Sequence, residues 1–265
     1  WNGGELDSFL IEITANILRF RDEDGKPLLD KILDVAGQKG TGKWSAIAAM
    51  DENDPLTLIT EAVYARLLSA LYPERIKAAR LYSGKLKVES GKLSDNAQLS
   101  IEDVRQALYA AKLISYAQGF SLLRHASEHY GWDLDYGTIA RIWRKGCIIR
   151  SVFLQKITEA YRKDPDLENL LFDDFFHTKI QEALPAWRRV VAEGALSGVA
   201  LPAMSSALNY FDGLRTLYSA ANMIQAQRDY FGAHTYERTD RERGHFFHTN
   251  WTGEGGNTVS GTYSV

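Results

Sequence analysis

One long stretch of apolar periodicity, residues 100–131, constrains the fold more than any other part of this 265-residue chain. Ser100 and Asp103 have the spacing of a helix-capping box, and the periodic run ends near Gly131. At about 1.5 Å per residue, a helix over this stretch is roughly 45 Å long. Its middle is apolar nearly all round, which is typical of a helix covered on several sides. The stretch therefore predicts a central helix.

Apolar residues recur at helical spacing through most of the remaining chain, and no clear β-hairpin signal is present. We expect loops at 37–43 and 83–99, and an irregular segment beyond Arg238. These patterns predict an all-α fold: a multi-helix domain, 1–237, around the long central helix, with an extended C-terminal tail, 238–265. The further helices expected are 5–20, 26–36, one opened by Asp54-Pro55 and closed at Tyr72-Pro73, a surface helix to about Tyr82, 135–144, 151–162, 172–193, 202–218 and 222–237.

Charge and cysteine content exclude several classes of protein. With 31 basic and 34 acidic residues the formal net charge is −3, which argues against a general nucleic-acid binder. No uncharged apolar run reaches the roughly 18 residues of a membrane span, so we expect no membrane partner. The single cysteine, Cys147, cannot form an intrachain disulfide and fits a cytoplasmic location. We expect it to be a buried structural thiol.

The glycine-rich segment 37–43, Gly-Gln-Lys-Gly-Thr-Gly-Lys, has the G-x-x-x-x-G-K spacing of a phosphate-binding loop. A nucleotide P-loop needs Ser or Thr next, and Trp44 stands there instead. The preceding residues are also helix-like and do not read as a buried strand. A simpler anion-binding loop, using lysines, Thr41 and flexible backbone, and a solvated lysine-rich turn both remain open.

The segment His125-Ala-Ser-Glu-His129 matches H-x-x-E-H, in which two histidines share one helical face. A zinc site would need a third protein ligand and a cleft. Because the pair falls at the end of the predicted central helix, the helix dipole alone favours histidines there. We therefore expect surface histidines and assign no metal.

Arg66 is flanked at helical spacing by small and apolar residues, so desolvating its guanidinium is costly without an anion beside it. The anion could be a ligand or a protein carboxylate, and the sequence favours neither of these two alternatives. Its neighbours at three and four residues are Ala62, Val63, Ser69 and Ala70.

The run 225–234 places Arg228 and His234 around aromatic and small residues. The plain alternative is a helix that packs Tyr230 and Phe231 into a core and leaves Arg228 in water.

Taken in order, a series of motifs resembles the decarboxylating 6-phosphogluconate dehydrogenase family. The resemblance runs from residue 1 to about Gly253, which makes a chance match very improbable. The motifs are LDSFLIEIT at 6–14, AGQKGTGKW at 36–44, EAVYAR at 61–66, SYAQGF at 115–120, WRKGCIIRS at 143–151, QAQRDYFGAHTY at 225–236 and HTNWT at 248–252.

The resemblance implies the helical C-terminal half of an enzyme of the oxidative pentose phosphate pathway and gluconate utilization. That enzyme converts 6-phosphogluconate and NADP+ to ribulose 5-phosphate, CO2 and NADPH. The family's coenzyme domain precedes this half, and no G-x-G-x-x-G after a strand occurs here, so NADP would be bound mainly by that domain. The family's His-Asn-Gly-Ile-Glu-Tyr-Gly segment, with its catalytic Lys and Glu, is also absent. We therefore assign no catalytic acid or base in this chain.

By the same resemblance, Lys39, Thr41 and Arg66 hold the substrate phosphate, and Lys43 is a weaker choice than Lys39. Arg228 and His234 would reach the substrate site of the other subunit of a homodimer. Several cations and N–H donors suit a sugar phosphate that also carries a carboxylate. A non-catalytic helical scaffold or interaction module is the alternative function.

Overall fold

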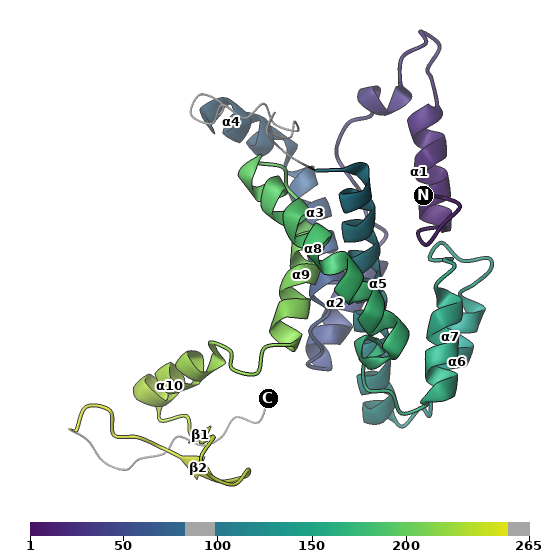
Figure 1. The fold of residues 1–265 in the computed structure, drawn as a ribbon. Helices are drawn as coiled ribbons and strands as arrows, with labels where there is room; N and C mark the ends of the chain where they lie inside the picture. The colour runs from purple at the N-terminus through teal and green to yellow at the C-terminus, as the bar shows by residue number, and fades with distance from the viewer. Residues whose placement is uncertain (83–98, 254–265) are drawn as a thin grey trace. The chain divides into compact units, whose positions relative to one another are not determined.

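The computed structural model describes residues 1–82 and 99–253, and Figure 1 shows its helices and strands. The loop expected at 83–99 lies outside the described residues apart from Leu99, as does the tail beyond Gly253. The chain divides into two compact units, Trp1–Phe211 and Asp212–Val265, which are described separately. The prediction of an all-α fold is confirmed, since the described residues are mostly helical. The domain boundary expected at 237/238 stays a prediction.

The first unit holds most of the helices. In chain order its elements are α1 (Phe9–Arg19), η1 (Leu28–Lys31), α2 (Thr41–Asp51), α3 (Thr57–Ala70), α4 (Tyr72–Tyr82), α5 (Ile101–Tyr130), α6 (Tyr136–Ile142), α7 (Leu154–Lys163), η2 (Leu170–Phe172), α8 (Asp174–Leu196) and α9 (Pro202–Leu214), which ends just beyond the unit boundary.

Helix α5 is the central helix that the sequence predicts. The Ser100 hydroxyl accepts from the Asp103 N–H at 3.0 Å, and the Asp103 carboxylate accepts from the Ser100 N–H at 2.8 Å. This reciprocal pair satisfies two N–H groups at the helix start. Gly131 ends the helix in a left-handed conformation with φ 67°, which glycine adopts without a steric penalty.

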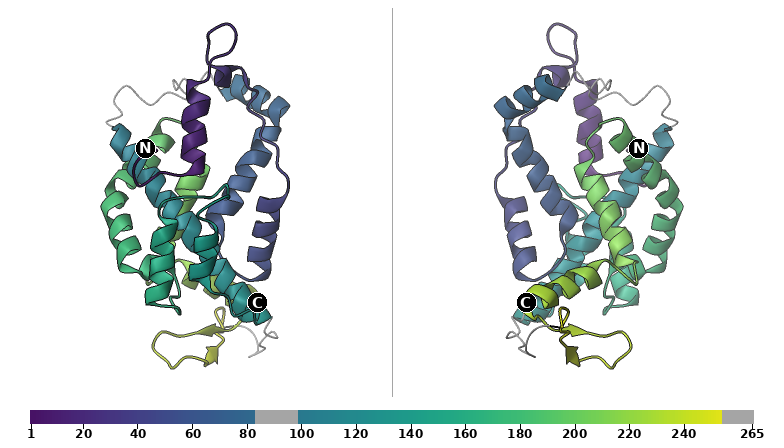
Figure 2. Two further views of the ribbon diagram at one scale, coloured as in Figure 1. Left: turned by 90° about the vertical axis from the view of Figure 1, so that its right-hand side faces the viewer. Right: turned by 90° about the vertical axis from the view of Figure 1, so that its left-hand side faces the viewer.

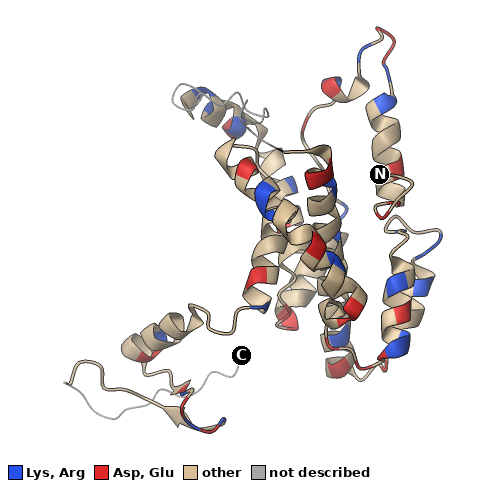
Figure 3. Ribbon diagram, viewed as in Figure 1, with Lys and Arg blue, Asp and Glu red and all other residues tan. Residues whose placement is uncertain are grey.

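The apolar core forms where α8 packs along α5, with α6, α7 and α9 around them. Acidic and basic residues are interspersed along the outer faces of α5 and α8 (Figure 3), as the near-zero net charge leads one to expect. No helix among the described residues is long and apolar enough to cross a membrane. The largest fully buried side chains include Phe120, Leu113 and Ile114 of α5, Leu154 and Ile157 of α7, and Phe176, Ile180 and Trp187 of α8.

The helix expected over 26–36 is wrong, because the structure has only the short 3₁₀ helix η1 there. The chain leaves η1 in an extended conformation at Ile32. Ile32 and Leu33 are 57% and 58% exposed, so the apolar spacing that suggested a helix faces no core within this chain. Spacing of apolar residues predicts a helix only where something covers the apolar side.

The second unit consists of α10 (Ala221–Gly232) and a short hairpin of β1 (Tyr236–Glu237) and β2 (Phe246–Phe247). The two strands are antiparallel, with Tyr236 opposite Phe247. The sequence gives no clear hairpin signal here, because two-residue strands are too short to show an alternating pattern. Ala233 ends α10 with φ 49°, and this left-handed residue turns the chain back toward the helix.

Asp229 joins α10 to the segment that follows the hairpin. Its carboxylate accepts from the His248 ring at 2.8 Å, the Thr249 N–H at 3.0 Å and the Trp251 indole at 2.9 Å. The residue is completely buried. A buried carboxylate is tolerated only when donors surround it in this way.

Candidate functional site

The glycine-rich segment is partly loop and partly helix. We expect a loop to Lys43 from the sequence, but α2 already begins at Thr41, after Gly40 with φ 99°. The first N–H groups of a helix have no partner within it and attract anions. Thr41 is the first residue of α2, Lys39 precedes it by two residues, and both are exposed.

Gly42 explains why α2 and α3 lie so close together, side by side in Figure 2. A Cβ atom at Gly42 would stand 2.9 Å from the Cγ2 atom of Val63, which is closer than real Cβ contacts. The second glycine of the P-loop-like pattern therefore serves helix packing. Because Val63 lies against Gly42, the next turn of α3 brings Arg66 to the start of α2.

Arg66 donates from Nη2 to the carbonyl oxygen of Gly37 in the glycine loop. Its side chain is exposed, and it forms no ion pair with any carboxylate among residues 1–82 and 99–253. The alternative of a buried salt bridge is therefore wrong. A guanidinium that contacts only a carbonyl keeps donors available for an anion.

Contacts from α3 and α4 hold the segment that leads into the glycine loop. The Ser69 hydroxyl accepts from the Ala36 N–H at 2.9 Å, and Arg75 donates to the Asp34 carbonyl at 3.2 Å and pairs with its carboxylate. The hydrogen bond that Arg75 donates to the Asp34 carboxylate lowers the pKa of Asp34 and raises the pKa of Arg75. Sequence reasoning missed Ser69 and Arg75, because contacts across 33 and 41 residues leave no local pattern.

The two histidines of the H-x-x-E-H pattern hold the opposite end of the α2–α3 pair. His125 Nδ1 lies 2.8 Å from the Asp54 carboxylate, and His129 Nδ1 lies 2.7 Å from that of Glu52. Asp54 also accepts from Ser121 at 2.7 Å, so it does not cap α3 as expected. Within the part of the chain that the structure describes, no cluster of three potential metal ligands occurs. The pattern thus fastens the α2–α3 turn to α5.

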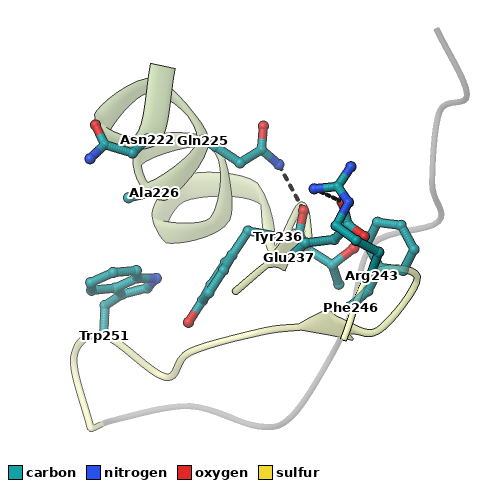
Figure 4. Close-up of a pocket in the computed structure, with 9 residues that line it drawn as sticks. Asn222, Gln225, Ala226, Tyr236, Glu237, Arg243, Phe246 and Trp251 are labelled. Carbon is teal, nitrogen blue, oxygen red and sulfur yellow. Dashed lines mark hydrogen bonds and ion pairs between the residues drawn. The ribbon is translucent and has the colours of Figure 1, made fainter. Parts of the chain in front are cut away.

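Arg228 and His234 lie in the second unit, and both are partly buried. Tyr230 and Phe231 are 61% and 74% exposed, so the alternative in which they fill a core of this chain is wrong. Arg228 donates from Nη1 to the Gln225 side chain at 3.1 Å. Gln225 also lines a cavity of about 480 Å³ beside the hairpin, shown in Figure 4.

Cys147 is partly exposed and not buried as expected. It lies in the segment before α7, where Tyr116 donates to the Ile149 carbonyl.

Comparison with known proteins gives a family match over residues 1–251, described as the 6-phosphogluconate dehydrogenase C-terminal domain. The chain belongs to this family. The match agrees with the motifs quoted from the sequence and with the all-α architecture.

Similar proteins in this family come from distant organisms. The decarboxylating 6-phosphogluconate dehydrogenases of Rattus norvegicus and Treponema pallidum are 56% and 54% identical, over the whole chain and over 54% and 55% of their own lengths. A structure of the Plasmodium falciparum enzyme, described in apo form and in complexes with NADP+ and 6-phosphogluconate, shares 42% identity with a TM-score of 0.88. That similarity covers 95% of this chain and 53% of the other. The chain therefore spans about half the length of these relatives.

The described residues contain no strand–turn–helix unit of the kind that binds dinucleotides. Their only sheet is the two-residue hairpin of the second unit, and no strand runs into a glycine-rich turn and a helix. Such a unit is what cradles a dinucleotide pyrophosphate in coenzyme domains.

Proposed function

We propose that this chain is the substrate-phosphate-binding and dimer-forming part of an NADP-dependent, decarboxylating 6-phosphogluconate dehydrogenase. The observation that carries the proposal is Arg66, turned toward the glycine loop at the start of α2, with Lys39 and Thr41 beside it. The names of the relatives support the activity, and the TM-score of 0.88 supports a shared geometry.

In this proposal each group binds the phosphate in its own way. Arg66 supplies paired N–H donors that match phosphate oxygens, and Lys39 adds a compact charge. Thr41 and the free N–H groups of α2 add neutral donors in line with the helix dipole. The Gly37 carbonyl holds the guanidinium near this place before the phosphate arrives. Positioning of this kind lowers the entropy lost on binding.

Arg228 and His234 are proposed to complete the substrate site of a partner subunit in a homodimer. Exposed apolar side chains on α2 and α3 support such an interface, since monomeric proteins seldom leave a contiguous apolar patch in water. Those exposed side chains include Trp44, Ile47, Met50, Tyr64, Leu67, Leu68 and Leu71.

The redox and proton-transfer groups of the proposed reaction belong to the half of the relatives that this chain does not span. NADP+ would accept hydride there, and this chain's residues would hold the phosphate end of the sugar against that half. We infer a cytoplasmic location for the enzyme, which the single cysteine supports.

The test is steady-state kinetics in a protein of the relatives' full length that contains this chain. Replacing Arg66 by Ala should raise KM for 6-phosphogluconate about a hundredfold, because a hydrogen-bonded charge pair contributes about 1.5–3 kcal/mol. Lys39→Ala should raise KM about tenfold. Lys43→Ala is the matched control and should change KM less than about threefold.

Two outcomes would contradict this proposal. Equal effects of Lys39→Ala and Lys43→Ala would refute the assignment of the loop. A folded protein that neither turns over nor binds 6-phosphogluconate would favour the scaffold alternative.

A further inference from the structure

We infer that Gln225 and Gly232 are positioning residues, which fix Arg228 and His234 relative to each other within the second unit. The inference rests on the proposed function, because it assigns a purpose to the side chains that surround the two proposed substrate-binding residues. Neither residue is expected to touch the substrate.

Gln225 bridges the two functional side chains with its two amide atoms. Its Oε1 accepts from Arg228 Nη1 at 3.1 Å, and its Nε2 donates to the Thr235 carbonyl at 2.7 Å. Figure 4 shows the Gln225 side chain reaching across from α10 to the segment that enters β1. Thr235 follows His234 directly, so one amide ties the arginine on the helix to the backbone that carries the histidine.

An amide suits this bridge for a specific chemical reason. It offers one acceptor and two donors from the same planar group. A carboxylate would have no donor for the Thr235 carbonyl, and a lysine would have no acceptor for Arg228. Both bonds run from a part-buried side chain, where losing a partner costs more than at an exposed site.

Gly232 fixes His234 by leaving room for it. A Cβ atom at position 232 would stand 2.8 Å from both Cδ2 and Nε2 of the His234 ring. The left-handed Ala233 folds the chain back so that this ring lies over the glycine. An alanine at 232 would therefore displace the imidazole, although it would suit the helix itself.

Gln225→Leu and Gly232→Ala should differ in their effect on stability and agree in their effect on substrate affinity. Gln225→Leu keeps the size of the side chain and removes both bonds. Gly232→Ala should leave the opening free energy of the second unit unchanged or higher, because the displaced atoms are the far end of a side chain that can rotate. Both changes should weaken substrate binding. A merely structural role would lower stability and affinity together.

The experiment is a kinetic mutant cycle in the full-length protein that contains this chain. Gln225→Leu and Gly232→Ala should each raise KM for 6-phosphogluconate about five- to tenfold, with kcat changed less than about threefold. In a background carrying Arg228→Ala and His234→Ala, neither change should lower kcat/KM further, because the groups that they position are gone. Hydrogen exchange of the Thr249 amide supplies the stability readout, because it reports on the second unit itself.

Two matched controls use the same chemistry without the contacts. Asn222→Leu removes an amide that lines the same cavity and whose oxygen accepts from the neighbouring Met223 N–H at 2.7 Å. Gly213→Ala adds a methyl group to α9 at a glycine with nothing within 4 Å. Both should leave KM within about twofold of the unsubstituted enzyme.

The outcomes separate this inference from the proposed function. An unchanged KM in Gln225→Leu, or an equal loss of kcat/KM in both backgrounds, would overturn the positioning role while the proposed function stands. An unchanged KM in the Arg228→Ala, His234→Ala background would overturn the proposed function, and the inference with it.

Discussion

Each of the two units of this chain is stabilised internally by a different kind of buried group. The first unit buries an apolar cluster that includes Phe120, Phe176 and Trp187. In the second unit, the only buried residue among those described is a carboxylic acid, Asp229. Apolar burial stabilises in proportion to area and needs no particular partner. A buried carboxylate stabilises only while each of its donors stays in place, so the second unit depends on a few specific contacts.

The largest effect should come from breaking the apolar unit. Trp187 is completely buried, and its indole donates to the Met204 carbonyl at 3.2 Å. Trp187→Ala should lower the free energy of unfolding by about 3–5 kcal/mol, because it leaves a large cavity and removes this hydrogen bond. Denaturant unfolding followed by circular dichroism measures this. Trp132→Ala, at a tryptophan that is 52% exposed, is the control and should cost far less. Comparable losses would mean that burial does not dominate this unit.

An intermediate effect, confined to the second unit, should follow removal of its carboxylate. Asp229→Ala should lower the local opening free energy by about 2–3 kcal/mol, since three donors lose their acceptor. Hydrogen exchange of the Thr249 amide measures that opening, and the melting of the first unit should stay unchanged. The exposed Asp240, which pairs with Arg238 at 2.7 Å, provides the control Asp240→Ala.

The same carboxylate should make the second unit sensitive to acid. Burial alone would raise the pKa of Asp229, but hydrogen bonds from His248, the Thr249 N–H and Trp251 outweigh it and hold the pKa below its ordinary value. Since the unfolded chain then takes up the proton more readily, the stabilisation is complete above about pH 4 and falls as the pH drops further. The protection factor of the Thr249 amide, which compares its exchange with the intrinsic rate at the same pH, should fall over that range, and Asp229→Ala should abolish that fall.

The smallest effect has the opposite sign and concerns a cation in the apolar unit. Lys112 lies 5.3 Å from the centre of the Phe153 ring and bonds the Ser8 hydroxyl at 2.9 Å, with no carboxylate partner among the described residues. Burial lowers the pKa of Lys112 to about 8. Lys112→Met should therefore stabilise the protein at pH 7 by about 1 kcal/mol, after allowance for partial exposure.

The stability gained by Lys112→Met should shrink as the pH rises. The folded protein prefers neutral Lys112, so the cost of burying the charged ammonium group disappears between about pH 8 and 10.5. Thermal unfolding at pH 7 and pH 10 measures the change. Lys77→Met, at an exposed lysine of α4, is the control and should show no such trend. A destabilised Lys112→Met would show that the Ser8 bond outweighs the cost of burial.

Sequence patterns predicted the elements that depend on local chemistry. The capping box at Ser100 and the glycine at 131 define α5 because both signals act within one helical turn. The patterns failed where a partner far along the chain decides the outcome. Asp54 looks like a helix cap, yet it accepts from His125, 71 residues away. The tie from Ser69 to the glycine loop is equally invisible to local spacing.

For the proposed site, the family resemblance carried by the ordered motifs pointed to the side chains. The structure adds the contacts that surround them. Spacing alone made Gly42 part of a phosphate loop, whereas it provides the close approach of α2 and α3. Gln225 carried no signal of its own, because an amide on a helix has many uses until its two partners are known.

The single buried acid of the second unit also determines what a denaturation experiment can detect. Heat-capacity changes and denaturant m-values scale with the apolar surface exposed on unfolding. Since that surface lies in the first unit, bulk melting curves report on α5 and α8 and are nearly blind to the opening of α10. A variant can thus lose the ordered placement of Arg228 and His234 and still pass as a fully stable protein in a thermal screen.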